Sequence, residues 1–262
     1  MARLPELTAR HALFLDFDGT LVEIAPRPED VVLAPDTRAA LGALSRALGG
    51  AVAVISGRDI AVIDAHLAPL VLPVAGSHGA ERRMHDGRTQ RAEADPAAPD
   101  RTALDRAALD RAALDRAAAK MADFAAPHDL QVEKKHGAVT LHFRAKPGLE
   151  ADAMALARDL AAKESALRLI PGKMVAELAL AGHDKGGALR AYMAEPPFAG
   201  RVPLMAGDDT TDEDAMAVAM DTGGTAIRIG AGESKAPHRA ADTATFLAWM
   251  SSMAKRLEGE AA

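Results

Sequence analysis

Short apolar runs alternate with helical segments along most of this 262-residue chain. The runs are rich in β-branched residues and span a few positions each: 12–16 (ALFLD), 51–56 (AVAVIS), 71–76 (VLPVAG), 202–209 (VPLMAGDD) and 225–230 (TAIRIG). Helical patterning follows several of them, as at 35–48 and 233–257. Strands that alternate with helices favour βαβ units and a parallel sheet covered on both faces. We therefore expect an α/β fold with a Rossmann-like parallel-sheet core.

The pattern changes in the middle of the chain. A helical segment at 102–125 is followed by two alternating runs, QVEKK and AVTLHFR, then by a helix at 150–163 and two further runs near 167–170 and 174–180. Hairpins mixed with helices indicate an α+β insertion within the parallel domain. The sequence thus predicts a catalytic core of residues 1–100 and 182–262 and an inserted cap domain at 101–181.

The first helix of this insertion contains a repeat. Residues 103–117 read ALDRA three times. A five-residue step turns about 140° around a helix, so the repeated leucines do not form one stripe. A charged recognition surface is one interpretation, and a solvated alanine-rich helix is the simpler one, because charge runs usually mark exposed faces. We assign the repeat no function.

Charge and composition exclude several partners. The chain carries 31 Lys and Arg against 37 Asp and Glu, a formal charge of −6, which argues against nucleic acid or an anionic membrane as its main partner. It has no cysteine, so disulfides and thiolate metal sites are excluded. The first apolar run is broken by Asp16, too early for a signal peptide or a membrane span. We expect a cytoplasmic monomer.

Polar residues gather directly after the predicted strands. Their positions are Asp16 and Asp18, Ser56 with Arg58, His78, and the acidic group Asp208, Asp209 and Asp212. Because parallel strands share one carboxyl edge, these side chains are expected to meet in a crevice beyond it. Lys185 precedes a glycine pair at the start of a further helix, where backbone N–H groups favour an anion.

This set of side chains indicates phosphate chemistry. The concentration of carboxylates requires a cation, and oxygen ligands without imidazole or thiolate favour Mg²⁺ over zinc. Lys185, the Ser56 hydroxyl and backbone amides complement a phosphate, so phosphoryl transfer or hydrolysis is expected. A calcium loop fits poorly, since only a DxDG fragment matches and Arg27 stands where that loop needs glutamate.

The two aspartates of DFDGT are two residues apart, so on a strand both would point the same way. One carboxylate can attack phosphorus and form an aspartyl phosphate. The other can protonate the leaving oxygen and then activate water. The residues alone do not say which aspartate does which.

Four motifs of the chain resemble those of the haloacid dehalogenase superfamily: DFDGT (16–20), SGR (56–58), Lys185 in DKG, and GDDTTDE (207–213). Within it, VISGR, AGSHGAE (75–81), VEKKHGAVTLHFR (132–144) and PGKMVAELAL (171–180) resemble the trehalose-6-phosphate phosphatases. The similarity covers roughly residues 11–250.

The resemblance implies roles for the core residues. Asp16 would be the nucleophile and Asp18 the general acid and base. Ser56 and Lys185 would hold the phosphate, with Thr20 assisting through its backbone.

It also implies a Mg²⁺ site. The Asp16 carboxylate, the Asp18 backbone carbonyl and Asp208 would be the ligands. Asp209 and Asp212 would support them.

The cap would close over the sugar, and its predicted substrate-binding residues are Glu133, Lys135, Arg144, Lys173 and Glu177. Arg58 and His78 are further candidates for binding substrate. Simpler alternatives remain open: Ser56 as a helix N-cap, Arg58 on the surface, His78 shaping a turn, and Glu133 and Lys135 pairing within the sheet.

We therefore expect a Mg²⁺-dependent phosphatase that converts trehalose 6-phosphate to trehalose and phosphate. One alternative is a related capped phosphatase acting on another sugar phosphate, such as sucrose phosphate or mannosyl-phosphoglycerate. Another is a non-catalytic sugar-phosphate sensor that uses Asp16 as acceptor. A sensor needs neither a second aspartate nor a large cap, which argues against it.

Overall fold

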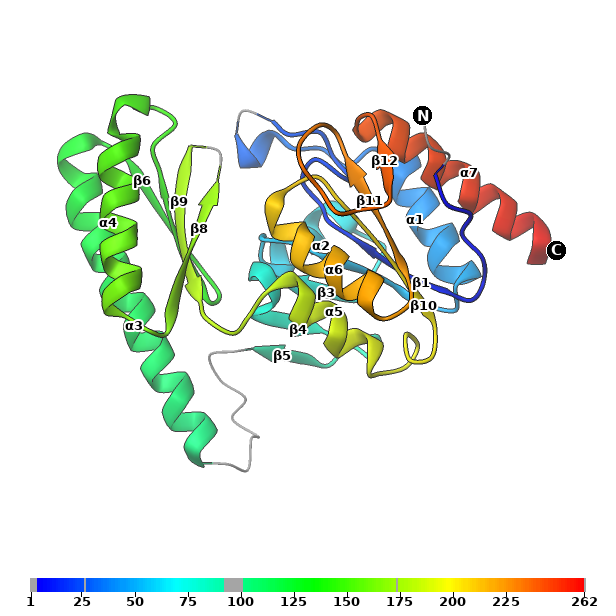
Figure 1. Ribbon diagram of the computed structural model, residues 1–262, viewed down its shortest axis with the longest axis horizontal. Helices are drawn as coiled ribbons and strands as arrows, with labels where there is room; N and C mark the ends of the chain where they lie inside the picture. Colours follow the sequence, from blue (N-terminus) through cyan, green and yellow to red (C-terminus); the bar gives the residue numbers. More distant parts are fainter. Residues whose placement is uncertain (1–3, 26, 92–100, 173, 262) are drawn as a thin grey trace. The chain divides into compact units, whose positions relative to one another are not determined.

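The computed structural model describes residues 4–25, 27–91, 101–172 and 174–261 (Figure 1). The chain divides into two compact units, Met1–Thr89 with Asp184–Ala262, and Gln90–His183. We refer to them as the core unit and the insertion unit. The sequence places the functional cap at 101–181, and that assignment stays a prediction.

A mainly parallel sheet forms the centre of the core unit. Its order is β12-β11-β10-β1-β2-β3-β4-β5. The strands are β1 (His11–Leu15), β2 (Val52–Ile55), β3 (Val74–Gly76), β4 (Glu81–Arg83), β5 (Thr89–Arg91), β10 (Val202–Gly207), β11 (Thr225–Ile229) and β12 (His238–Ala240). Neighbours from β12 to β3 pair in parallel, and β4 pairs with β3 in the antiparallel sense. The expected Rossmann-like α/β core is confirmed.

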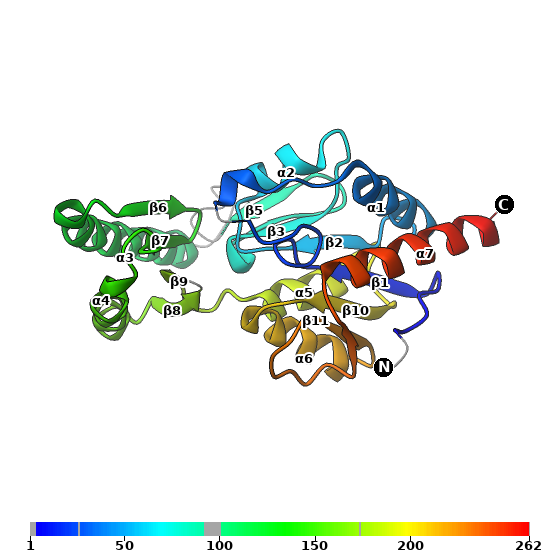
Figure 2. The same ribbon diagram turned by 90° about the horizontal axis from the view of Figure 1, so that it is seen from above.

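Helices cover both faces of this sheet. They are α1 (Pro35–Ala47), α2 (Ile60–Leu67), α5 (Lys185–Met193), α6 (Glu213–Asp221) and α7 (Thr243–Ala261). Figure 2 shows α1, α2 and α7 on one face and α5 and α6 on the other. Buried on both sides, β1 is apolar from Ala12 to Leu15, and Leu13, Phe14 and Leu15 are fully buried. None of the described helices combines the length and apolar character that crossing a membrane requires.

Short 3₁₀ turns connect several of these elements. They are η1 (Pro28–Asp30), η2 (Ser77–Gly79), η3 (Ala126–His128), η4 (Pro147–Leu149) and η5 (Thr210–Asp212). Of these, η2 directly follows β3, and η5 follows the acidic residues after β10. The sequence places polar clusters at both positions. The expected strand-end clusters therefore lie in turns at the carboxyl edge of the sheet.

The insertion unit has its own antiparallel sheet, in the order β6-β7-β9-β8. Its elements are α3 (Arg101–Ala125), β6 (Gln131–Lys135), β7 (Ala138–His142), α4 (Glu150–Lys163), β8 (Leu167–Gly172) and β9 (Val175–Leu180). Both helices pack on this sheet, over a core that includes Leu141, Leu178 and Leu180. Alternation along the strands therefore leaves every second side chain on the face away from α3 and α4.

Two of the repeated leucines of α3, Leu109 and Leu114, lie in different environments. Leu109 is 67% exposed, whereas Leu114 is 7% exposed and belongs to the core of the insertion unit. Arg116 reaches across to Glu164 at the end of α4, with Nε and Oε1 2.7 Å apart. The described part of the repeat thus forms a largely solvated helix with one buried face.

Candidate active site

A buried ammonium group joins three distant segments of the core unit. Lys185 Nζ donates to Asp16 Oδ1 at 2.7 Å and to Asp212 Oδ1 at 2.6 Å. Asp16 directly follows β1, Lys185 begins α5, and Asp212 ends the turn η5 after β10. The three residues are at most 4% exposed. Buried charges persist only when they are paired and hydrogen-bonded, so this arrangement ties the three segments together.

The start of α5 fixes the position of Lys185. Asp184 is the N-cap, and its Oδ1 accepts from Gly187 N at 2.5 Å. At Gly186 a Cβ would lie 2.7 Å from the Asp214 carbonyl oxygen, so glycine lets α5 approach α6 closely. The glycine pair was expected to present amides to an anion. The Gly187 amide instead donates to the N-cap residue Asp184, and for the Gly186 amide the anion contact stays a prediction.

Three carboxylates come together at the carboxyl edge of the sheet. One oxygen each from Asp16, Asp208 and Asp212 lies within 4.8 Å of the others. Among the residues that the structure describes, no donor forms a hydrogen bond to the Asp208 carboxylate. It lies against Gly19, where φ is +76° and a Cβ would collide with it. A partly exposed carboxylate without a donor from the described residues, beside two buried carboxylates, fits a hard divalent cation.

The electrostatics of this cluster show an excess of negative charge. Burial, and then repulsion from Asp212, raise the pKa of Asp16 well above its usual value despite the nearby Lys185. Burial, followed by Asp212 and Asp209, raises the pKa of Asp208 to about 6. Burial alone would lower the pKa of Lys185, but attraction by Asp16 and Asp212 outweighs it and the pKa is raised. Lys185 is therefore charged, and one lysine does not neutralise the carboxylates.

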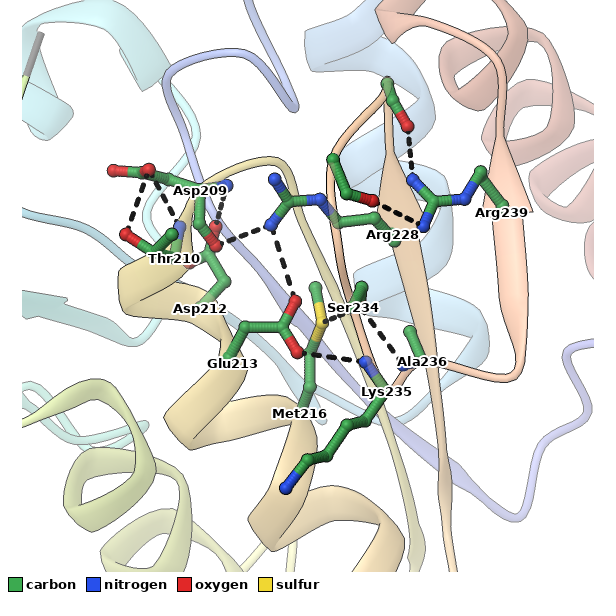
Figure 3. Close-up of polar contacts among 12 residues, drawn as sticks. Asp209, Thr210, Asp212, Glu213, Met216, Arg228, Ser234, Lys235, Ala236 and Arg239 are labelled. Atoms are coloured by element: carbon green, nitrogen blue, oxygen red, sulfur yellow. Dashed lines mark hydrogen bonds and ion pairs between the residues drawn. The ribbon is translucent and has the colours of Figure 1, made fainter.

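Asp209 belongs to a capping box at the start of η5. Its Oδ1 accepts from Thr210 N at 2.7 Å, and its own N–H donates to Asp212 Oδ2 at 2.9 Å (Figure 3). Asp209 thus shapes the acidic loop, while both Asp212 oxygens already accept hydrogen bonds. This geometry agrees with supporting positions for both residues.

Asp18 has a different partner from Asp16. Arg58 donates to it through two nitrogens, Nε to Oδ2 at 2.6 Å and Nη2 to Oδ1 at 2.7 Å. The Arg58 guanidinium also lies 5.6 Å from the centre of the Phe17 ring. Since β1 ends at Leu15, strand alternation does not set the direction of Asp18. The turn closed by Leu21 N and Phe17 O at 2.9 Å places it instead.

The loops after β2 and β3 are hydrogen-bonded to each other. Ser56 is 1% exposed, and its Oγ accepts from Arg58 N at 3.1 Å. Its carbonyl accepts from the N–H of His78, a residue with a φ of +54°. The N-cap position of α2 belongs to Asp59, so Ser56 does not cap that helix. Thr20 is fully buried, and its Oγ1 has no hydrogen-bond partner within the described part of the chain.

In the insertion unit, predicted sugar-binding residues share the sheet face away from the helices. Glu133, Thr140 and Glu177 lie opposite one another on β6, β7 and β9. Glu177 Oε2 accepts from Lys135 Nζ at 2.9 Å and from Thr140 Oγ1 at 2.6 Å. His142 Nε2 lies 3.0 Å from Glu133 Oε2. Arg144 follows β7 and is exposed, and Lys173 lies outside the described residues.

Two core residues that the sequence analysis missed also contact the site loops. Arg228 Nη1 donates to the Asp209 carbonyl at 2.8 Å, and Thr243 Oγ1 donates to the Gly19 carbonyl at 2.8 Å. An arginine inside the apolar strand TAIRI was a visible signal, because a charge in a buried strand needs a partner. Thr243, at the first position of α7, gave no signal of this kind.

The fold and site are those of a phosphatase, with an aspartate after the first strand, a lysine at a later helix start and an acidic loop after β10. The chain belongs to the trehalose-phosphatase family, whose sequence model matches residues 14–247. The family resemblance of its sequence motifs is thereby confirmed.

Curated relatives match along nearly the whole chain. It is 36% identical over 258 residues to the trehalose-6-phosphate phosphatase of Escherichia coli K12, covering 98% of this chain and 92% of that protein. It is 39% identical over 222 residues to a probable trehalose-phosphate phosphatase of Sinorhizobium fredii, covering 84% and 77%.

Solved structures share the fold. A trehalose-6-phosphate phosphatase related protein has a TM-score of 0.68 at 26% identity, covering 95% of this chain and 97% of that one. A haloacid dehalogenase-like hydrolase from B. subtilis has a TM-score of 0.59 at 15% identity, covering 94% and 99%, and it shows the fold alone.

The raised pKa of Asp208 predicts a pH-dependent response to Mg²⁺. Without metal, ionised Asp208 destabilises the folded state above about pH 6, and protonation removes this cost as the pH falls through that value towards its unfolded pKa of 3.8. Saturating MgCl₂ should therefore raise the Tm more at about pH 7.5 than at about pH 5, as measured by differential scanning calorimetry.

Substitution of the same residue separates stability from metal binding. Asp208→Asn should raise the metal-free Tm at about pH 7.5 by a few degrees, since about 1 kcal/mol corresponds to ~2–4 °C, and should abolish the Mg²⁺ response. Asp214→Asn, an exposed change in α6, is the control and should respond like the wild type. Equal Mg²⁺ shifts at the two pH values would contradict this account.

Proposed function

We propose that this protein is a Mg²⁺-dependent phosphatase that hydrolyses trehalose 6-phosphate to trehalose and inorganic phosphate. The observation that carries the proposal is the buried Asp16–Lys185–Asp212 arrangement beside Asp208, in a member of the trehalose-phosphatase family. The similarity to the E. coli trehalose-6-phosphate phosphatase over nearly its full length supports the substrate.

In the first step an Asp16 carboxylate oxygen attacks phosphorus. The bond between phosphorus and the sugar 6-oxygen breaks, and Asp18 donates its proton to that leaving oxygen. Lys185 holds one Asp16 oxygen at 2.7 Å, which leaves the other for attack and fixes its direction. The products of this step are free trehalose and an aspartyl phosphate on Asp16.

In the second step a water molecule attacks the phosphorus of the aspartyl phosphate. Asp18, now ionised, takes the proton of that water, the bond between phosphorus and Asp16 breaks, and inorganic phosphate leaves. Asp18 is suited to both transfers because its side chain is 38% exposed, so it can exchange protons with substrate and solvent. Its Arg58 partner fixes the direction of the carboxylate while Asp18 is ionised.

Mg²⁺ would be held by the carboxylates of Asp16 and Asp208 and by the backbone carbonyl of Asp18. When bound, it would supply positive charge for the phosphate oxygens and the developing transition state. Asp209 and Asp212 would support the site, since their side-chain bonds to Thr210 N, Asp209 N and Lys185 Nζ shape the loop that carries Asp208.

Phosphate binding would use Lys185, the Ser56 hydroxyl and Thr20. Ser56 Oγ accepts from Arg58 N, so its own proton remains available for a phosphate oxygen. Thr20 would assist through its backbone, since its hydroxyl is fully buried. Direct substrate binding by Arg58 and His78 stays a prediction.

The insertion unit would act as the cap that selects the sugar. Glu133, Lys135 and Glu177 present charged groups on one sheet face, and such groups suit the many hydroxyls of a disaccharide. Arg144 and Lys173 are proposed to join them. The monomeric state, the cytoplasmic location and the absence of nucleic-acid partners stay predictions.

A panel of sugar phosphates tests the substrate. Phosphate release should be fastest from trehalose 6-phosphate, slower from sucrose phosphate and mannosyl-phosphoglycerate, and lost in each case when EDTA removes the metal. The measurement is kcat/KM for each compound with and without MgCl₂. Preference for another sugar would contradict the substrate assignment, and full activity in EDTA would contradict the metal.

Two conservative substitutions test the separate roles of Asp16 and Asp18 in DFDGT. Asp16→Asn should abolish turnover because the amide is a poor nucleophile. Asp18→Asn should slow turnover by about 10²–10⁴-fold because it removes general acid–base catalysis. Steady-state phosphate release measures both, with circular dichroism as the check on folding. An active Asp16→Asn enzyme would contradict the nucleophile assignment, and full turnover in Asp18→Asn would contradict the acid–base role.

A further inference from the structure

Arg228 is a charged residue buried inside a strand of the core sheet. It is 6% exposed on β11, between the buried side chains Ile227 and Ile229. A guanidinium in such a place lowers the stability of the fold unless hydrogen bonds and an opposite charge compensate it. Its partners therefore indicate why an arginine stands there.

Those partners belong to the acidic loop of residues 208–213. Arg228 Nη1 donates to the Asp209 carbonyl oxygen at 2.8 Å and lies 3.4 Å from Glu213 Oε1 (Figure 3). The other Glu213 oxygen accepts from Lys235 N at 3.3 Å. Along the sheet, Arg228 is the direct neighbour of Gly207, the residue before Asp208. Arg228 thus contacts the loop near both of its ends.

The carbonyl that Arg228 holds lies inside the capping box. The same residue, Asp209, donates its N–H to Asp212 Oδ2 at 2.9 Å, and Asp212 Oδ1 accepts from Lys185 at 2.6 Å. Lys185 in turn contacts Asp16. A continuous set of hydrogen bonds therefore runs from Arg228 through the loop to the carboxylates of the cation site.

We propose that Arg228 is a positioning residue that fixes the 208–213 loop and so sets the affinity of Asp16 and Asp208 for the divalent cation. This inference rests on the Mg²⁺ dependence in the proposed function. Charge alone would act in the opposite direction, because a guanidinium near the cluster repels a metal ion. The direction in which Mg²⁺ affinity changes when Arg228 is replaced therefore distinguishes a positioning role from a purely electrostatic one.

Mg²⁺ titrations of Arg228 variants test the proposal with two readouts. The first is the Tm of the metal-free protein as MgCl₂ is added, and the second is the Mg²⁺ concentration that gives half-maximal phosphate release. Arg228→Met should raise both half-saturation concentrations by about 10-fold or more, the range typical of groups that orient metal ligands. Arg228→Lys, which keeps the charge but not the forked geometry, should show a smaller rise.

Arg239 provides a matched control. It is exposed on β12, directly beside Arg228 in register, and it too bonds carbonyl oxygens, at Gly230 (2.5 Å) and Gly232 (2.9 Å) (Figure 3). Neither glycine belongs to the acidic loop. Arg239→Met should therefore keep the half-saturation concentrations of the wild type.

Two outcomes would overturn the proposal. A lower Tm in Arg228→Met with unchanged Mg²⁺ half-saturation would mean that Arg228 only stabilises the fold. Tighter Mg²⁺ binding in that variant would mean that its charge dominates. If Arg228→Met does not fold, Arg228→Lys and Glu213→Gln decide the matter, since both loosen the same contact and must weaken Mg²⁺ binding.

The same titration separates this proposal from the proposed function. A wild-type enzyme that shows no response to Mg²⁺ in either readout would remove the metal dependence and this inference with it. A normal wild-type response, with half-saturation values in the Arg228 variants equal to those of Arg239→Met, would contradict the role of Arg228 alone.

Discussion

The ammonium group of Lys185, shared between Asp16 and Asp212, is the interaction on which the core of this molecule depends. It lies where β1, the start of α5 and the turn after β10 meet, and all three groups are almost fully buried. Removing the Lys185 charge would leave both carboxylates uncompensated, which typically lowers stability by about 3–5 kcal/mol. The ion pairs of Lys185 therefore hold the three segments in place, and the same ion pairs form the site.

The same interaction leaves the site short of positive charge. With Asp208 included, three carboxylates lie close together around one lysine, and the pKa values of Asp16 and Asp208 are raised accordingly. A divalent cation would supply the missing charge, at the place where the proposed function also puts the phosphate. Metal binding and ionisation of Asp16 would thus be coupled, because a cation that attracts the phosphate would also favour the ionised form of Asp16.

The sequence was sufficient to predict the residues whose position follows from the end of a parallel strand. Asp16, Ser56 and Asp208 come directly after strands of one sheet, and the Asp16 and Asp208 carboxylates lie close together. The pairing of Asp18 with Arg58 could not be predicted, because a turn and not strand alternation sets its direction. The partners of Arg228 depend on how β11 and the acidic loop pack, and the contact of Lys135 with Glu177 depends on the order of strands in the second sheet. These contacts depend on tertiary structure, which a local sequence pattern does not predict.

The central claim is that Asp16, oriented by Lys185, carries the phosphoryl group during turnover. Borohydride reduces an aspartyl phosphate to homoserine, so the enzyme is mixed with trehalose 6-phosphate and MgCl₂, quenched with borohydride, digested and sequenced by mass spectrometry. The account predicts homoserine at position 16, only when substrate is present, and none in the Asp16→Asn variant. Substrate turnover without homoserine at position 16, or homoserine at Asp18 or Asp208 instead, would contradict it.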